Sequence, residues 1–204
     1  MNAWDLDLFW KINRELTHPV LDWLMPTLSA IDVWLPFLVL LLAFIAWRGG
    51  RRERLMLLAL ALALGLSDGV VGNGLKKTFD RVRPRDQMSG VMMRDLAKVK
   101  PRVLALFKAP EIKISKVKKV PETGNSLPSN HTINLFAAAT VIGLFFRRWA
   151  LPMYLLAAAV AYSRVYVGAH WPSDIPPSAA LGLSIGWLVV ALLQKLFKPS
   201  ASEA

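Results

Sequence analysis

The chain has 204 residues, of which 54% are hydrophobic and 19% charged, and it carries a net charge of +11. Several apolar runs and a positive mean hydropathy of +0.39 are typical of an integral membrane protein. Most of the positive charge lies in one loop, which argues against nucleic acid as a partner and favours anionic lipids or an anionic substrate. Because cysteine is absent, disulfides and thiolate metal sites are excluded.

The first thirty residues mix apolar and charged side chains. Within Trp4–Met25, charges such as Asp5 and Lys11 interrupt the apolar residues, so no cleavable signal peptide is expected. We interpret residues 1–30 as an interfacial N-terminal segment, a helix on the membrane surface that is broken near His18-Pro19. The alternative is a sixth membrane span at this position.

Apolar segments predict the rest of the fold. They cover Ile31–Trp47, Leu55–Leu75, Thr132–Phe146, Ala150–Val167 and Ile175–Phe197. Some are shorter than the ~20 residues that a perpendicular span needs, so flanking turns should complete them. The predicted fold is all-α: a polytopic transmembrane helical bundle of five spans, or six, forming a single domain over residues 1–204.

Charges in the connections predict the orientation. The short loops 48–54 and 147–148 and the tail with Lys195 and Lys198 fall on one side of a five-span bundle and are basic. By the positive-inside rule that side is cytoplasmic. The loop 76–130 is also basic, but long loops weigh less in this rule. It is therefore predicted to be an extracytoplasmic active-site loop, facing the periplasm or the outside of a bacterial inner (plasma) membrane.

The first polar cluster reads Lys76-x6-Arg83-Pro84. Seven residues are two helical turns, so Lys76 and Arg83 would share one face if the preceding helix continues, and Pro84 would end that helix at Arg83. The alternative is a basic membrane-flanking run whose side chains reach lipid headgroups.

The second cluster, Pro128-Ser129-Asn130-His131, precedes an apolar span. Ser129 or Asn130 is expected to be the N-cap, which leaves free backbone N–H groups that suit a phosphate. His131 would stand in the first helical turn at the same place. An ordinary helix cap beside an interfacial histidine is the alternative.

The third cluster is Ser163-Arg164-x5-His170-x3-Asp174. A histidine nucleophile needs one unprotonated ring nitrogen, and a carboxylate on the other nitrogen would fix that tautomer. Asp174 is placed to do this for His170. A capping aspartate next to an interfacial histidine is again the alternative.

In this order and spacing, the three clusters closely resemble the signature of the type 2 phosphatidic acid phosphatase superfamily over about Leu55–Leu193. The resemblance implies a metal-free, cofactor-free site that forms a phosphohistidine. His170 would be the nucleophile, Asp174 its orienting carboxylate and His131 the acid for the leaving group. The implied phosphate ligands are Lys76, Arg83, Ser129 and Arg164, with Asn130 beside them.

Two departures from the signature stand out: Asn130 replaces a glycine, and Pro176-Pro177-Ser178 replaces small aliphatic residues and glycine. Neither removes a group that the chemistry needs. The expected function is hydrolysis of a lipid phosphate, such as a polyprenyl diphosphate, phosphatidylglycerol phosphate, phosphatidic acid or a lipid A phosphate. A lipid phosphotransferase and a non-catalytic protein that binds anionic lipids are the alternatives. Membrane lipids are expected partners, and the sequence does not predict an oligomeric state.

The segment Arg85–Gly124 has no counterpart in the signature and is rich in lysine and arginine. It could rest on anionic lipid, or it could act as a lid that selects a headgroup with several charges. On the second interpretation we expect Lys116, Lys118 and Lys119 to contribute to that selection.

Overall fold

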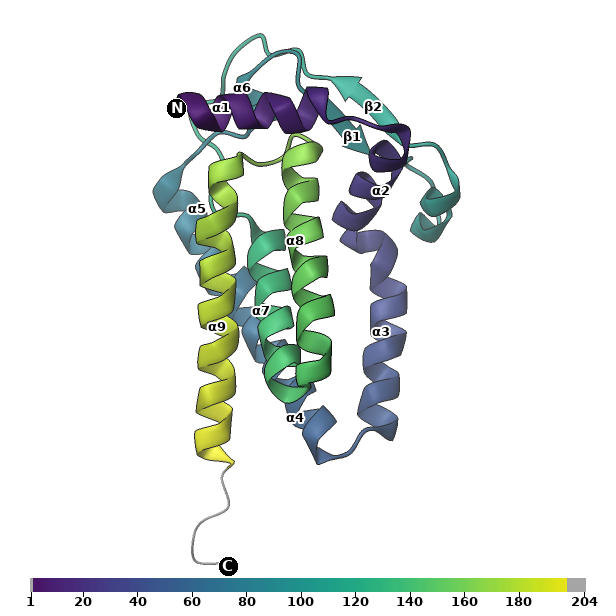
Figure 1. Ribbon diagram of the computed structural model, residues 1–204, viewed down its shortest axis with the longest axis vertical. Helices are drawn as coiled ribbons and strands as arrows, with labels where there is room; N and C mark the ends of the chain where they lie inside the picture. Colours follow the sequence, from purple (N-terminus) through teal and green to yellow (C-terminus); the bar gives the residue numbers. More distant parts are fainter. Residues whose placement is uncertain (1, 198–204) are drawn as a thin grey trace, which may run out of the picture.

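The computed structural model describes residues 2–197, apart from the side chains of residues 70–73. Residue 1 and residues 198–204 of the predicted domain lie outside the described residues. Long helices run in the same general direction and form a bundle, with shorter elements gathered at one end (Figure 1). The helices of the bundle are α3 (Ile31–Arg48), α4 (Arg51–Gly65), α5 (Asn73–Phe79), α7 (Asn130–Phe145), α8 (Ala150–Tyr166) and α9 (Ile175–Leu196).

Helices α4 and α5 form one continuous rod, because the π-helical stretch Leu66–Gly72 joins them. Among the described residues, three helical stretches are long and apolar enough to cross a membrane: Ile31–Arg48, Arg51–Gln87 and Pro172–Leu196. Helix α7 is apolar but shorter. The mostly helical fold is as predicted, whereas the number of spans, five or six, stays a prediction.

Helix α7 lies at the centre and packs against α4, α8 and α9. The buried core between these helices includes Leu60, Ile133, Val141 and Val190. The α7 and α9 backbones approach closely at Gly182, where a Cβ atom would lie 2.4 Å from the carbonyl oxygen of Ile133. Small residues at such crossings are typical of helices that pack within membranes.

Helix α3 has little contact with the rest of the bundle. Val33 is its one buried residue, while Leu40 and Trp47 are 69% and 73% exposed. A helix that is apolar on all sides and exposed on most of them is suited to lipid contact. Its N-terminal end is anchored, because Val33 packs with Leu96 and Ala105 and Asp32 pairs with Arg102.

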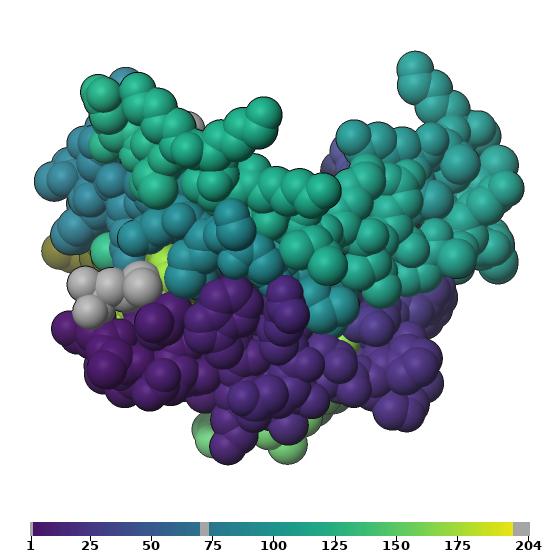
Figure 2. Space-filling model, turned by 90° about the horizontal axis from the view of Figure 1, so that it is seen from above, coloured from purple at the N-terminus to yellow at the C-terminus, as the bar shows by residue number. Residues whose placement is uncertain are grey.

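The N-terminal segment is helical and broken where the sequence predicts. Helix α1 (Ala3–Trp10) continues as a π-helical turn to Glu15, and α2 (Pro19–Ser29) begins after the N-cap residue His18. Helix α1 lies across the end of the bundle (Figures 1 and 2). Its Phe9 is fully buried against Trp171, with ring centroids 5.3 Å apart. One face of α1 is therefore buried on protein, which the interpretation as a surface helix did not include.

The segment Arg85–Gly124, called the basic loop below, contains β structure, so the all-α prediction was incomplete. After α6 (Pro84–Gln87), strand β1 (Met92–Asp95) pairs antiparallel with β2 (Glu111–Ile114), and a 3-10 turn, Arg102–Phe107, lies between the strands. Within β2, the alternation Ile112-Lys113-Ile114 is a sequence pattern typical of a strand. Beneath the hairpin, buried Arg94 pairs with Asp22 at 2.5 Å, which ties the loop to α2.

The prediction that Lys76 and Arg83 share one helix was wrong. Helix α5 ends at Phe79, because Asp80 adopts a positive φ of 46°, a conformation that aspartate tolerates better than most residues. Arg83 has extended backbone angles and is the N-cap of α6. Pro84 favours this extended conformation.

Candidate active site

The motif residues lie on five different segments that meet at the end of the bundle covered by α1 and the basic loop. Lys76 is on α5, Arg83 precedes α6, and Arg164 is near the end of α8. Ser129, Asn130 and His131 begin α7, while His170 and Asp174 lie in the turn from α8 to α9. From above, the N-terminal segment and the loop over residues 80–125 cover most of this end of the bundle (Figure 2).

His170 is buried, and its Nδ1 atom lies 2.6 Å from the main-chain carbonyl oxygen of Ser126. Asp174 Oδ2 is farther from the same nitrogen, at 3.6 Å. Burial lowers the pKa of His170 to about 4, although the neighbouring Asp174 carboxylate opposes this shift. The imidazole is therefore neutral at neutral pH, and Nε2 is the ring nitrogen that does not contact Ser126.

Asp174 is fully buried and accepts hydrogen bonds on both carboxylate oxygens. Its Oδ2 accepts from Ser126 Oγ at 2.5 Å and from Trp171 N at 2.9 Å. Its Oδ1 accepts from the Arg81 guanidinium at 2.5 Å. Sequence reasoning missed Ser126 and Arg81, because neither belongs to the motif spacing.

Ser129 is the N-cap of α7, as the sequence indicates, although its side chain caps no backbone N–H group. Its own N–H donates to Ser178 Oγ at 2.9 Å, and its Oγ accepts from Thr132 Oγ1 at 3.1 Å. Ser178 thus holds the start of α7 in place. This residue belongs to the Pro176-Pro177-Ser178 departure from the signature.

Asn130, the other departure, donates its amide to Asp68 Oδ1 at 2.5 Å. This bond links the start of α7 to the π-helical stretch between α4 and α5. The Asn130 Oδ1 atom is buried without a hydrogen-bond partner among the described residues. Asn130 therefore positions α7 through its amide nitrogen and leaves a carbonyl oxygen available.

The three motif cations lie within electrostatic reach of one another: Lys76 of Arg83 and Arg164, and Arg164 of Arg83. His131 is within reach of Arg164, Lys76 and His170. Within the described part of the chain, the Nε atoms of Arg83 and Arg164 are buried and have no hydrogen-bond partner. Buried donors of this kind normally have an acceptor, and a phosphate oxygen would supply one.

A cleft of about 370 Å³ opens beside Arg164, between the α2–α3 connection and the basic loop. Two of its arginines are paired, Arg94 with Asp22 and Arg102 with Asp32. Arg85 and Lys98 form no salt bridge with any residue that the structure describes. The charged lining consists of Arg85, Arg94, Lys98, Arg102, Arg164, Asp32 and Asp95.

The three lysines expected to select a charged headgroup do not line this cleft. These residues, Lys116, Lys118 and Lys119, are exposed and come after strand β2 in the sequence. The cations that face the cleft come instead from α6, from β1 and the segment after it, from the 3-10 turn and from α8.

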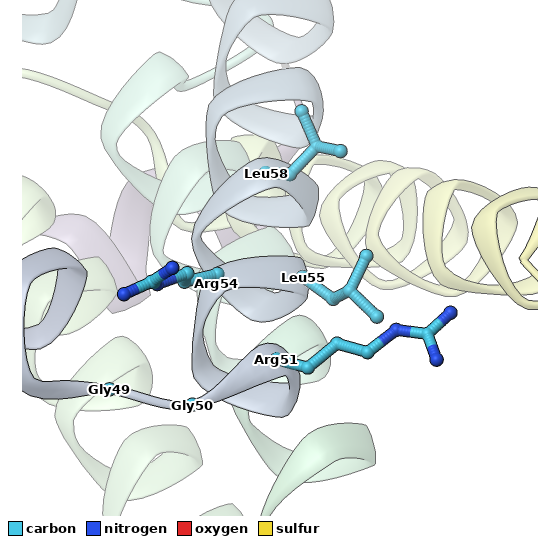
Figure 3. Close-up of a pocket in the computed structure, with 6 residues that line it drawn as sticks. All are labelled: Gly49, Gly50, Arg51, Arg54, Leu55 and Leu58. Atoms are coloured by element: carbon cyan, nitrogen blue, oxygen red, sulfur yellow. The ribbon is translucent and has the colours of Figure 1, made fainter.

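A second cavity, of about 440 Å³, lies at the turn between α3 and α4, at the opposite end of the bundle (Figures 1 and 3). Arg51 and Arg54 project from α4 in different directions, and Gly49 and Gly50 form the turn (Figure 3). None of the motif residues lines it. The chemistry is therefore to be sought at the other end. Across residues 2–197, no group of three or more His, Asp or Glu side chains is arranged to hold a metal ion.

Comparison with solved structures supports the helical fold described above. The crystal structure of LpxE from Aquifex aeolicus matches with a TM-score of 0.63 and 26% identity, over 93% of this chain and 96% of that one. A PAP2-type phosphatidylglycerolphosphate phosphatase from Bacillus subtilis matches with a TM-score of 0.58. At 20% identity, over 97% of this chain and 90% of that one, it shows a shared fold only.

Curated relatives match to different extents. The lipid A 4'-phosphatase of Porphyromonas gingivalis is 26% identical over 186 residues, which is 90% of this chain and 70% of that protein. The bacitracin transport permease protein BcrC of Bacillus licheniformis is 40% identical, but over 62 residues that make up only 30% of either chain. Three of its described helical stretches are long and apolar enough to span a membrane and it shares the fold of a transmembrane PAP2-type phosphatase, so the chain is an integral membrane protein. The family model of the PAP2 superfamily matches residues 54–198, more than half of the chain, and the protein therefore belongs to that superfamily.

Proposed function

We propose that the protein removes a phosphate group from a membrane lipid through a phosphohistidine on His170. The observation that carries this proposal is the convergence of Lys76, Arg83 and Arg164 on two histidines, with two buried guanidinium Nε atoms left without acceptors among the described residues. Fixed cations around a neutral imidazole are what a phosphoryl transfer requires.

In the first half of the reaction, His170 Nε2 attacks phosphorus. The new N–P bond forms as the P–O bond to the lipid breaks, and His131, in its protonated imidazolium form, gives a proton to the departing oxygen. The Nδ1–H group stays on the Ser126 carbonyl, while Asp174 stabilises the positive charge that develops on the ring. Lys76, Arg83 and Arg164 neutralise the phosphoryl oxygens.

In the second half, His131 accepts a proton from water, which attacks the phosphohistidine. The N–P bond breaks, inorganic phosphate leaves, and both imidazoles return to their starting protonation states. Since the three cations supply the positive charge, this route involves no divalent metal.

A lipid substrate is supported by the apolar helices and by the printed names of the relatives, which include lipid A 4'-phosphatase and undecaprenyl-diphosphatase. The cleft beside Arg164 favours lipids that carry a second phosphate group. Arg85 and Lys98 line that cleft and form no salt bridge among the described residues, so an additional anionic group would be attracted there. We further propose that the site faces the periplasm or the outside of an inner membrane, because the opposite end carries the short basic loops.

The proposal is tested by incubating the purified protein in nanodiscs with a panel of lipid phosphates in the presence of EDTA. The panel contains a polyprenyl diphosphate, phosphatidylglycerol phosphate, phosphatidic acid and a lipid A phosphate, with free phosphate as the readout. We expect release from at least one lipid, abolished by His170→Ala and unaffected by His18→Ala. Activity that is lost in EDTA and restored by magnesium would contradict the mechanism, and transfer of phosphate to an alcohol instead of water would identify a phosphotransferase.

A further inference from the structure

Asp5 on α1 is a buried carboxylate that lies outside residues 54–198, the part matched by the family model. Its side chain is about 2% exposed. It accepts hydrogen bonds from Ser173 N at 2.9 Å, from Ser173 Oγ at 2.7 Å and from the Arg81 guanidinium at 2.6 Å. A buried carboxylate is costly unless such donors replace water, so this arrangement defines one orientation of Asp5.

Arg81 joins Asp5 to the catalytic turn. One guanidinium nitrogen donates to Asp5 Oδ2, and the other donates to Asp174 Oδ1 at 2.5 Å and to Ser173 Oγ at 2.8 Å. The guanidinium also lies over the Trp171 ring, 5.5 Å from its centroid. Because the guanidinium is planar and its donors are fixed in a fork, a single arginine can hold two carboxylates in a defined relation.

We propose that Asp5 and Arg81 are positioning residues for the nucleophile. Arg81 is the donor that holds Oδ1 of Asp174, and this bond keeps Oδ2 turned toward His170. Asp5 in turn keeps Arg81 in place, together with Phe9, which packs α1 onto Trp171. The N-terminal helix thereby contributes to the catalytic geometry, although it touches no reacting atom. The inference rests on the proposed function, because the effect of positioning is seen in the step catalysed by His170.

The experiment compares Asp5→Asn and Arg81→Lys in the full-length protein in nanodiscs. The asparagine variant keeps the size of the side chain but loses its charge, and the lysine variant keeps the charge but loses the fork. Asp7→Asn is the matched control, since Asp7 is exposed on the same helix. Two quantities are measured: the rate of phosphoenzyme formation from an aryl phosphate, and the inhibition constant of inorganic phosphate.

We expect Asp5→Asn and Arg81→Lys each to slow phosphoenzyme formation roughly 10-fold, the scale of effect that small misplacements of reacting groups produce. The inhibition constant of phosphate should stay near the wild-type value, because Lys76, Arg83 and Arg164 are unchanged. The double variant should be no slower than the single ones, since both break the same link. Asp7→Asn should behave as wild type.

Wild-type rates in both variants would overturn the inference, and so would a phosphate inhibition constant that rises in step with the loss of rate. If Asp5→Asn does not fold, Arg81→Lys carries the same test alone. Absence of a phosphoenzyme in the wild-type protein would instead overturn the proposed function, so the two failures are distinguishable.

Discussion

The Nδ1 atom of His170 lies 2.6 Å from the carbonyl oxygen of Ser126, a full ångström closer than the Asp174 carboxylate at 3.6 Å. A carbonyl oxygen only accepts hydrogen bonds, so the proton of the neutral ring belongs on Nδ1. The lone pair is then on Nε2, the nitrogen available to attack phosphorus. A main-chain group sets the tautomer, and the carboxylate acts on the charge that appears later.

This tautomer can be observed by NMR of protein labelled with ¹⁵N-histidine, in which His170→Ala assigns the signal. We expect a protonated Nδ1 and an unprotonated Nε2 at neutral pH. Because burial lowers the pKa of His170 to about 4, below the ordinary value near 6.5, the neutral form should persist on acidification until about pH 4. A midpoint near 6.5 would contradict the effect of burial on this pKa, and a proton on Nε2 would contradict the assignment of the nucleophilic atom.

The two motif histidines should fail differently when replaced. His170→Ala removes the attacking nitrogen, so neither a phosphoenzyme nor phosphate release should be detected with any substrate. His131→Ala removes a proton donor, so its cost should follow the basicity of the leaving group. We expect a loss on the order of 10²–10⁴-fold for phosphatidic acid, and a smaller loss in phosphoenzyme formation from an aryl phosphate.

With His131 replaced, attack by water should also be slow, so the phosphoenzyme should accumulate and be detected after an alkaline quench, in which the N–P bond is stable. His18→Ala is the control, because His18 is exposed, caps α2 and belongs to none of the three motifs. Equal losses for good and poor leaving groups in His131→Ala would show that this residue has another role.

The cleft beside Arg164 should determine preference among substrates. Replacing Arg85 and Lys98 together with glutamine should raise KM for a prenyl diphosphate roughly 10-fold, and much less for the monophosphate of the same lipid. The matched control replaces Lys118 and Lys119, which carry the same charge on the same loop but do not line the cleft. If the control pair has the same effect, the loop acts through its overall charge on the membrane, and the cleft is not a second phosphate site.

The orientation in the membrane is testable by labelling, because the natural chain has no cysteine. Thr123→Cys should react with an impermeant thiol reagent in intact cells, and Gly50→Cys should not. Thr123 is exposed, whereas a side chain at neighbouring Gly124 would lie 2.3 Å from the Arg81 carbonyl oxygen and is unsuitable. Labelling at position 50 alone would reverse the predicted topology.

The motif residues that the sequence singles out lie together in the structure, whereas the residues that hold them in place could not be predicted. Motif spacing identified the residues that meet at the end of the bundle, because each motif lies at a helix end or turn that short-range rules can locate. Ser126 and Arg81 could not be predicted in this way. Their contacts with His170 and Asp174 depend on the paths of the loops that contain them. The two loops are hydrogen-bonded to each other, because Ser126 N donates to the Arg81 carbonyl oxygen at 2.8 Å.

Asp5 illustrates a different limit. In the sequence it is one of several charges that interrupt an apolar segment, and that pattern indicated a helix on the membrane surface. Its burial arises because α1 packs onto the turn at Trp171, a tertiary contact between residues at opposite ends of the chain. The hairpin was likewise missed in part, because only Ile112–Ile114 alternates and its partner strand Met92–Asp95 carries no clear pattern.

The position of helix α3 should depend strongly on the lipid or detergent that surrounds the protein. Val33 and the Asp32–Arg102 pair anchor one end, Ile45 packs against the bundle core near the other end, and most of the helix surface faces outward. In a bilayer, α3 would gain little additional lipid contact by separating from the bundle, since acyl chains already surround most of it. A detergent micelle constrains the lateral position of a helix less than a bilayer does. In detergent, α3 should therefore be the first long helix to detach, while the core around α7 persists. The choice of detergent, more than temperature, should therefore decide whether the purified protein keeps the cleft that α2, α3 and the basic loop enclose.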